Sequence, residues 1–128
     1  VEGTDIPDEG TINLPIGRDP DDKRKRKING PHAAPALTRY RVLRKQSGYA
    51  LVQISLETGR THQIRVHFAA LGHPLVGDPL YNSSNGSPFL MQHSWKVDLL
   101  MPFTKQRKLI EAPIPSHFIK FEQELSRR

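Results

Sequence analysis

The sequence contains no cysteine and no long hydrophobic run, and each absence excludes a class of protein. Without cysteine there is no disulfide framework and no thiolate metal site. No apolar stretch approaches the roughly 18 residues that a membrane-spanning helix needs. No signal peptide is visible either, so the sequence predicts a cytoplasmic protein with no membrane partner.

The chain has 128 residues and begins with Val1 rather than with a methionine. This length suits one domain. Hydrophobic residues make up 36% of it, which allows a modest core, and eleven prolines and nine glycines indicate short elements. Because an initiator methionine is missing, we expect the chain to be part of a longer protein.

The net charge is positive, with 19 Lys and Arg against 13 Asp and Glu. A basic domain attracts phosphates, although an ordinary basic protein has the same balance. The charge is densest within residues 18–27, which include no apolar side chain. We therefore expect a solvated loop or hairpin tip that is mobile until its charges contact phosphates. The candidate phosphate contacts are Lys23, Arg24, Lys25, Arg26 and Lys27.

Two segments alternate between apolar and polar residues with the period of a strand. They are residues 36–44 and 49–57, and Gly48 lies in the turn between them. This pattern predicts an antiparallel hairpin. Residues 89–102 and 108–112 carry further strand patterns.

Two segments have the pattern of helices. Residues 61–71 have Thr61 as a candidate N-cap and Gly72 as the stop, and Ile64, Phe68 and Leu71 form one apolar stripe. This helix is expected to be largely enclosed. Ser116 is a candidate cap for a terminal helix over residues 116–127. The predicted fold class is α+β, with a mostly antiparallel or mixed sheet and helices packed on it.

The chemistry concentrates at residues 59–67, Gly-Arg-Thr-His-Gln-Ile-Arg-Val-His. Arg65 lies on the enclosed helix, and an enclosed guanidinium needs an anion because it cannot lose its proton. That anion is a carboxylate from elsewhere or a phosphate; alternatively, Arg65 extends to water. Arg60 and Thr61 lie at the strand-to-helix junction, where free backbone N–H groups favour an RNA phosphate. A structural cap with nothing bound is the alternative.

The histidines do not predict a metal site. His62 and His67 are five residues apart, which does not align two ligands on one face of a helix. The zincin spacing, the nucleophile-elbow motif and the P-loop are all absent from the sequence.

Residues 56–67, Leu-Glu-Thr-Gly-Arg-Thr-His-Gln-Ile-Arg-Val-His, and 71–81, Leu-Gly-His-Pro-Leu-Val-Gly-Asp-Pro-Leu-Tyr, together resemble the signature of RluA-type RNA pseudouridine synthases. The flanks agree: residues 36–40 resemble the family's Ala-x-Thr-x-Tyr strand, and residues 92–95 resemble its Leu-His-Ala segment with Gln92 in place of Leu. The resemblance covers nearly the whole chain.

The resemblance implies an enzyme that flips a uridine out of ribosomal or transfer RNA and isomerises it without a metal or organic cofactor. It implies that Arg65 pairs with the family's catalytic Asp, and that Arg60, Thr61, His62 and Gln63 contact RNA or substrate.

The catalytic Asp belongs to a His-Arg-Leu-Asp motif, which is absent from these 128 residues. The chain is therefore expected to be the C-terminal portion of a catalytic domain, without its N-terminal half and inactive alone, in which Arg65 faces an open half-site. The alternatives are a catalytically inert RNA-binding module and a basic interaction domain that does not contact RNA.

Overall fold

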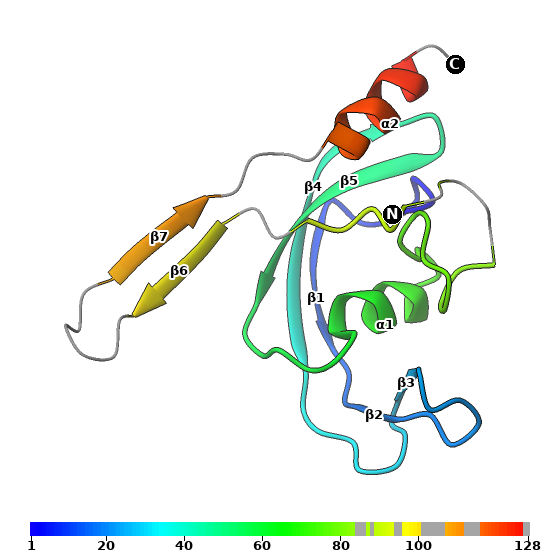
Figure 1. The fold of residues 1–128 in the computed structure, drawn as a ribbon, viewed down its shortest axis with the longest axis vertical. Helices are drawn as coiled ribbons and strands as arrows, with labels where there is room; N and C mark the ends of the chain where they lie inside the picture. Colours follow the sequence, from blue (N-terminus) through cyan, green and yellow to red (C-terminus); the bar gives the residue numbers. More distant parts are fainter. Residues whose placement is uncertain (84–86, 88, 94–95, 101–106, 112–115, 127–128) are drawn as a thin grey trace.

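The structure is a computed structural model, and it describes residues 1–83, 87, 89–93, 96–100, 107–111 and 116–126 (Figure 1). The described part is mostly antiparallel β-structure with two helices. In chain order its elements are β1 (Glu9–Asn13), β2 (Ile16–Arg18), β3 (Arg26–Ile28), β4 (Leu37–Gln46), β5 (Tyr49–Leu56), α1 (Gln63–Ala70), β6 (Lys96–Leu100), β7 (Arg107–Glu111) and α2 (Ser116–Ser126).

The main sheet contains three antiparallel strands in the order β1-β4-β5. Its β4–β5 hairpin confirms the alternation predicted for residues 36–44 and 49–57. Tyr40 pairs with Ile54 in register, and the ladder shifts by one residue after Val42.

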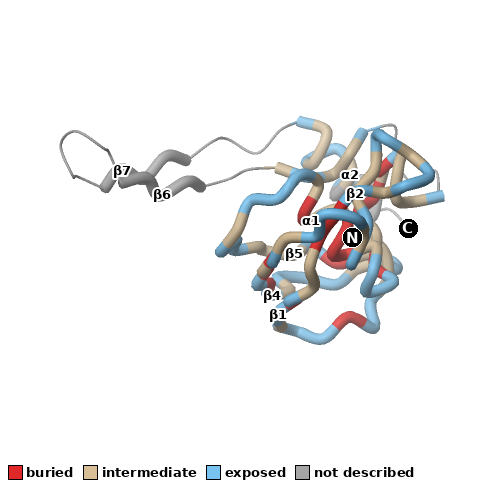
Figure 2. The backbone as a smooth tube through the Cα atoms, turned by 90° about the horizontal axis from the view of Figure 1, so that it is seen from below, coloured by how far each residue is buried: buried red, intermediate tan, exposed pale blue. Residues whose placement is uncertain are grey.

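Helix α1 lies across one face of this sheet (Figure 1). Phe68 is fully buried, and its ring meets that of Tyr40 edge to face at 5.5 Å. Figure 2 shows the buried residues gathered in this region. The predicted helix is confirmed, but its expected apolar stripe is wrong at one end, since Leu71 is 39% exposed. The residues that α1 buries are Gln63, Val66, His67 and Phe68, two of them polar.

The basic run belongs to a second, smaller sheet. Strands β2 and β3 pair antiparallel, with Ile16 opposite Ile28 and Arg18 opposite Arg26. The expected hairpin tip therefore comprises residues 19–25, whereas Arg26 and Lys27 lie in a strand that the sequence did not predict. No alternation in the sequence predicts β3, because Ile28 is the only apolar residue of this strand.

Towards the C-terminus, β6 and β7 form an antiparallel pair in the two regions predicted as strands. The expected helix over residues 116–127 is confirmed as α2, and its Phe121 ring lies 5.2 Å from that of Tyr49. Neither described helix is long and apolar enough to cross a membrane.

Candidate active site around Arg65

Arg65 is held by a carboxylate of its own chain. Its Nε donates to Oδ2 of Asp78 at 2.9 Å, and its Nη2 donates to Oδ1 at 2.8 Å. The Arg65 side chain is 14% exposed and that of Asp78 is 0% exposed, so the pair is largely desolvated. We expected Arg65 to face an open half-site. That expectation is wrong for Nε and Nη2, which Asp78 binds. The anion comes from outside helix α1, as predicted, but from 13 residues further along the chain.

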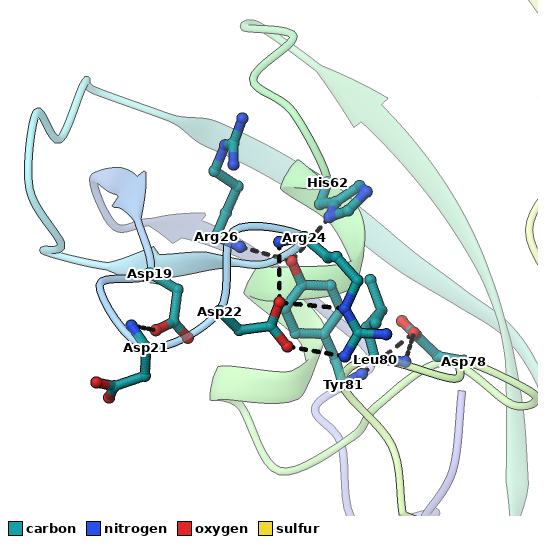
Figure 3. Close-up of polar contacts among 9 residues, drawn as sticks. All are labelled: Asp19, Asp21, Asp22, Arg24, Arg26, His62, Asp78, Leu80 and Tyr81. Atoms are coloured by element: carbon teal, nitrogen blue, oxygen red, sulfur yellow. Dashed lines mark hydrogen bonds and ion pairs between the residues drawn. The ribbon is translucent and has the colours of Figure 1, made fainter.

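The turn before Tyr81 brings Asp78 to this position. Gly77 has a φ of +75°, and a Cβ on it would collide with the backbone carbonyl of Phe89. Glycine avoids both penalties. Asp78 Oδ1 then accepts the backbone N–H groups of Leu80 at 2.9 Å and Tyr81 at 3.2 Å (Figure 3). These bonds fix the carboxylate in a local Asx-type turn in addition to its bonds from Arg65.

Both members of the pair are charged. Burial alone would raise the pKa of Asp78, but hydrogen bonds from Arg65 and from the backbone outweigh burial and lower it. The hydrogen bond to Asp78 raises the pKa of Arg65. The site therefore contains a fixed, two-pronged ion pair, a geometry that lysine cannot reproduce.

Tyr81 connects the ion pair to the basic hairpin. The Arg65 guanidinium lies over its ring, 5.2 Å from the centroid, and Lys25 Nζ lies 5.5 Å from the same centroid. The hydroxyl oxygen accepts the backbone N–H of Arg26 at 2.8 Å and lies 2.8 Å from His62 Nδ1 (Figure 3). One side chain thus joins β3, the beginning of α1 and the ion pair.

His62 is the last residue before α1 and has a left-handed backbone, with φ at 56°. It takes the place of Thr61, so the predicted Thr61 cap is wrong. Burial and the positive charges of Arg65 and Arg26 lower the pKa of His62. The imidazole is therefore neutral near pH 7. A neutral His62 with its proton on Nε2 lets the Tyr81 hydroxyl donate to Nδ1 while the same oxygen accepts from Arg26.

Residues 1–70 match the model of a protein family described as RNA pseudouridylate synthase. The chain belongs to this family. It is 41% identical over 117 residues to the ribosomal large subunit pseudouridine synthase D of Nitrosomonas europaea, with 84% of this chain and 34% of the relative covered. It is 44% identical over 113 residues to an uncharacterized RNA pseudouridine synthase of Bacillus subtilis, with 84% and 36% covered.

A solved structure of the human RNA pseudouridylate synthase domain containing 1 agrees in fold with a TM-score of 0.73. It is 32% identical, and the match covers 89% of this chain and 51% of that one. The chain spans about a third of the length of the curated relatives above.

Gln63, predicted to contact RNA or substrate, is a buried link between segments of the described chain. It is 3% exposed. Its Oε1 accepts from Thr58 Oγ1 at 2.8 Å and from the Arg60 backbone N–H at 2.9 Å, while its Nε2 donates to the Leu37 carbonyl and to Thr38 Oγ1. With its amide engaged on both sides, Gln63 holds the turn before α1 in place. Its contact with RNA or substrate stays a prediction.

His67 continues the same network and is fully buried. Its Nε2 lies 2.9 Å from the Leu14 carbonyl, which only accepts, so Nε2 carries the proton. Its Nδ1 therefore accepts from Thr38 Oγ1 at 2.8 Å. Burial lowers the pKa of His67, although the hydrogen bond to Leu14 partly opposes this. Both ring nitrogens serve to join β4, α1 and the chain before β2.

The predicted phosphate contacts differ in their surroundings. Arg24 is paired with Asp22 at 2.9 Å, and Lys25 covers Tyr81, whereas Lys23 and Lys27 are exposed. Arg60 and Thr61 are exposed immediately before His62, and Arg60 Nε donates to the Pro35 carbonyl at 2.8 Å. Arg60 and Thr61 thus lie immediately before α1, and Lys25 lies over the Tyr81 ring.

Sequence reasoning missed Asp78 and Tyr81 as members of this site. A signal for Asp78 was present: it is the one charged residue within residues 71–81, apart from histidine, in an otherwise apolar and turn-rich stretch. An enclosed arginine that needs an anion has few candidate partners, and a carboxylate in apolar surroundings is the natural one. Tyr81 had no such signal, since its role depends on contacts with three separate segments.

Proposed function

We propose that the protein that carries this chain isomerises uridine to pseudouridine in ribosomal or transfer RNA. The chain's membership of the RNA pseudouridylate synthase family supports this proposal, and relatives named for the large ribosomal subunit favour ribosomal RNA. The observation that carries it is the position of Arg65, which is fixed on one edge and accessible on the other.

The reaction breaks the bond between uracil N1 and ribose C1′ and forms a bond between uracil C5 and C1′. The hydrogen on C5 leaves as a proton, and N1 gains a proton, so the overall change is an isomerisation without oxidation or reduction. The uridine must leave the base stack for its glycosidic bond to be reached.

Arg65 has the geometry of a positioning residue for the reacting carboxylate. Asp78 engages its Nε and Nη2, but Nη1 has no partner among the described residues. No buried side-chain nitrogen or oxygen in the described part lacks a partner, so Nη1 reaches solvent. We assign this free edge to the catalytic Asp, whose His-Arg-Leu-Asp motif these 128 residues lack. A cation within about 4–6 Å keeps that carboxylate ionised, and the planar fork sets its direction.

The second candidate function is a catalytically inert RNA-binding module. The complete neutralisation of Arg65 by Asp78 favours it. A module of this kind would bind RNA with the same salt dependence but form no pseudouridine.

Release of tritium from RNA labelled at uridine C5 tests the proposal, because the C5 proton leaves in the reaction. With the intact protein we expect release, and with the 128-residue chain alone we expect none. Arg65→Met should lower turnover roughly 100-fold or more, as removal of one charge-stabilising donor does. Its RNA affinity should change little.

Arg41→Met, at an exposed position on β4, is the matched control and should turn over normally. No release by the intact protein on any ribosomal or transfer RNA would leave the inert module as the function. Near-normal turnover by Arg65→Met would remove the role assigned to Arg65.

A further inference from the structure

The β2–β3 hairpin and the turn before α1 border an open hollow of about 390 Å³. We call it the basic hollow because three arginines line it and no acidic residue does. Its lining residues are Ile16, Gly17, Arg18, Arg26, His32, Gly59, Arg60 and Thr61.

The arginines of the basic hollow lie close enough together to repel one another. Arg18 and Arg26 lie directly opposite each other in the β2–β3 ladder. Like charges at such positions are destabilising, because the Cβ atoms are only about 5 Å apart. Within the described part of the chain, neither they nor Arg60 form an ion pair with a carboxylate. An anion in the hollow would relieve this repulsion.

The backbone around the basic hollow is closely packed, so the segments that carry the three arginines are ordered before any ligand arrives. A Cβ on Gly17 would collide with the carbonyl of Gly30, which shows how tightly the two segments approach. The backbone N–H of Arg18, the residue after Gly17 in β2, donates to the Pro31 carbonyl at 2.8 Å. A site whose backbone is already ordered loses less entropy on binding.

Hydrogen bonds to backbone carbonyls orient two of the three arginine side chains, Arg60 to Pro35 and Arg26 to Lys25. Arg60 Nε is bonded to the Pro35 carbonyl, which leaves both of its terminal nitrogens available. The backbone of Arg26 is held by the Tyr81 hydroxyl, and Figure 3 shows its guanidinium extending away from the Tyr81 ring. The hollow thus offers planar N–H forks, which match the oxygens of a phosphate.

We propose that the basic hollow binds a backbone phosphate of the RNA strand next to the uridine that enters the Arg65 site. This inference rests on the proposed function for the kind of anion, and on the hollow itself for its position. Thr61 lines the hollow and His62 follows it, while the Tyr81 hydroxyl contacts both His62 and the backbone of Arg26. A strand held in the hollow therefore lies beside the Tyr81–Arg65 contact.

The test measures binding of a fluorescently labelled RNA to the intact protein by anisotropy between 0.05 and 0.3 M NaCl, roughly the range over which phosphate contacts weaken. Arg18→Gln/Arg60→Gln removes two charges from the hollow. Arg39→Gln/Arg41→Gln removes two from exposed positions on β4 and is the matched control. We expect the hollow variant to bind RNA roughly tenfold or more weakly than wild type, and its salt slope to fall by about 0.7 for each phosphate that it no longer binds. The control should stay within about twofold of wild type.

Arg18→Gln alone guards against misfolding, because the Arg18 side chain makes no hydrogen bond in the described part of the structure. It should retain the wild-type melting temperature and still weaken RNA binding several-fold. Equal losses of affinity in the hollow and control variants would overturn the proposal.

Inorganic phosphate provides a measurement that does not depend on the enzyme's activity. Phosphate should shift the amide NMR signals of Gly17, Gly59 and Thr61 in wild type but not in Arg18→Gln/Arg60→Gln. If these shifts occur and the intact protein releases no tritium, phosphate binding by the basic hollow is supported and the proposed function is refuted. If tritium release succeeds while neither phosphate nor RNA distinguishes the variants, the hollow is no site and the proposed function survives.

Discussion

Replacing Asp78 with Asn removes one charge from the ion pair while keeping the shape of the side chain. The amide oxygen can still accept the backbone N–H groups that Asp78 Oδ1 accepts. Its NH₂ group, however, turns a donor towards the donors of Arg65. Because the Asp78 side chain is 0% exposed, no water replaces the lost carboxylate at that position.

The expected cost follows from this burial. Removing one partner of a buried ion pair costs about 3–5 kcal/mol, because the other charge is left uncompensated. Arg65 is 14% exposed and its Nη1 reaches solvent, so the low end applies, about 3 kcal/mol. For a domain of this size, each kcal/mol lowers Tm by about 3–5 °C. Asp78→Asn should therefore melt roughly 10 °C below wild type.

A double-mutant cycle separates the pair from its surroundings. Asp78→Asn, Arg65→Met and the double variant are compared by urea unfolding at pH 7. The double variant should be more stable than the two single losses predict, by about 2 kcal/mol, because neither charge is then left alone. Additive losses would refute the ion pair as the source of stability.

Acid provides an independent check on the same pair. The folded-state pKa of Asp78 is lowered, so its contribution is fully present above its unfolded value near 4. The contribution disappears as pH falls through the lower, folded pKa. The stability difference between wild type and Asp78→Asn should accordingly narrow below about pH 4. A difference that persists undiminished at pH 2 would contradict this assignment.

Three further outcomes are expected. Gly77→Ala should lower the free energy of unfolding by about 1–3 kcal/mol, because it combines a positive φ with a collision. Gly72→Ala should lower it less, because Gly72 has a φ of +82° but nothing nearby. Melting temperatures in the reverse order would contradict this. Replacing all five charges of Lys23–Lys27 with Gln should weaken RNA binding and flatten its salt dependence; an unchanged slope would make the run a solubility feature. The folded-state pKa of His67 is lowered, so stability should fall as pH drops below about 6.5, and His67→Gln should reduce that loss in urea titrations at pH 7.5 and 5.5.

The elements that the sequence predicted are those with local causes. The β4–β5 hairpin follows from period-two alternation, and the helices follow from helical spacing, with a stop at Gly72 for α1 and a start at Ser116 for α2. The limits of α1 were less well predicted, because His62 begins the helix with a left-handed backbone and an interaction with Tyr81 rather than with a capping side chain. That interaction joins residues 19 positions apart, beyond the reach of a capping pattern.

The errors share a physical origin in polar residues that are buried. Gln63 was predicted to contact RNA or substrate, and His67 was given no partner, because polar side chains on a helix usually face water. In this chain they are satisfied by Thr38, Thr58 and backbone carbonyls from other segments. Alternation identifies the face of β4 that carries Thr38, but not the partner of its hydroxyl. Hydrogen bonds between distant segments are therefore the part of the site that sequence patterns predict least well.

Under the proposed function, the ion pair changes what Arg65 would contribute to catalysis. Since Asp78 already neutralises the guanidinium, a catalytic carboxylate gains less from its charge than from the direction of the free Nη1 edge. A lysine has a single nitrogen, and Asp78 would hold it, which leaves no second edge to present. Arg65→Lys should therefore recover most of the stability lost in Arg65→Met but only a small part of the turnover. Equal recovery of both would mean that charge alone is sufficient, and that the two-edged geometry of Arg65 has no part in the reaction.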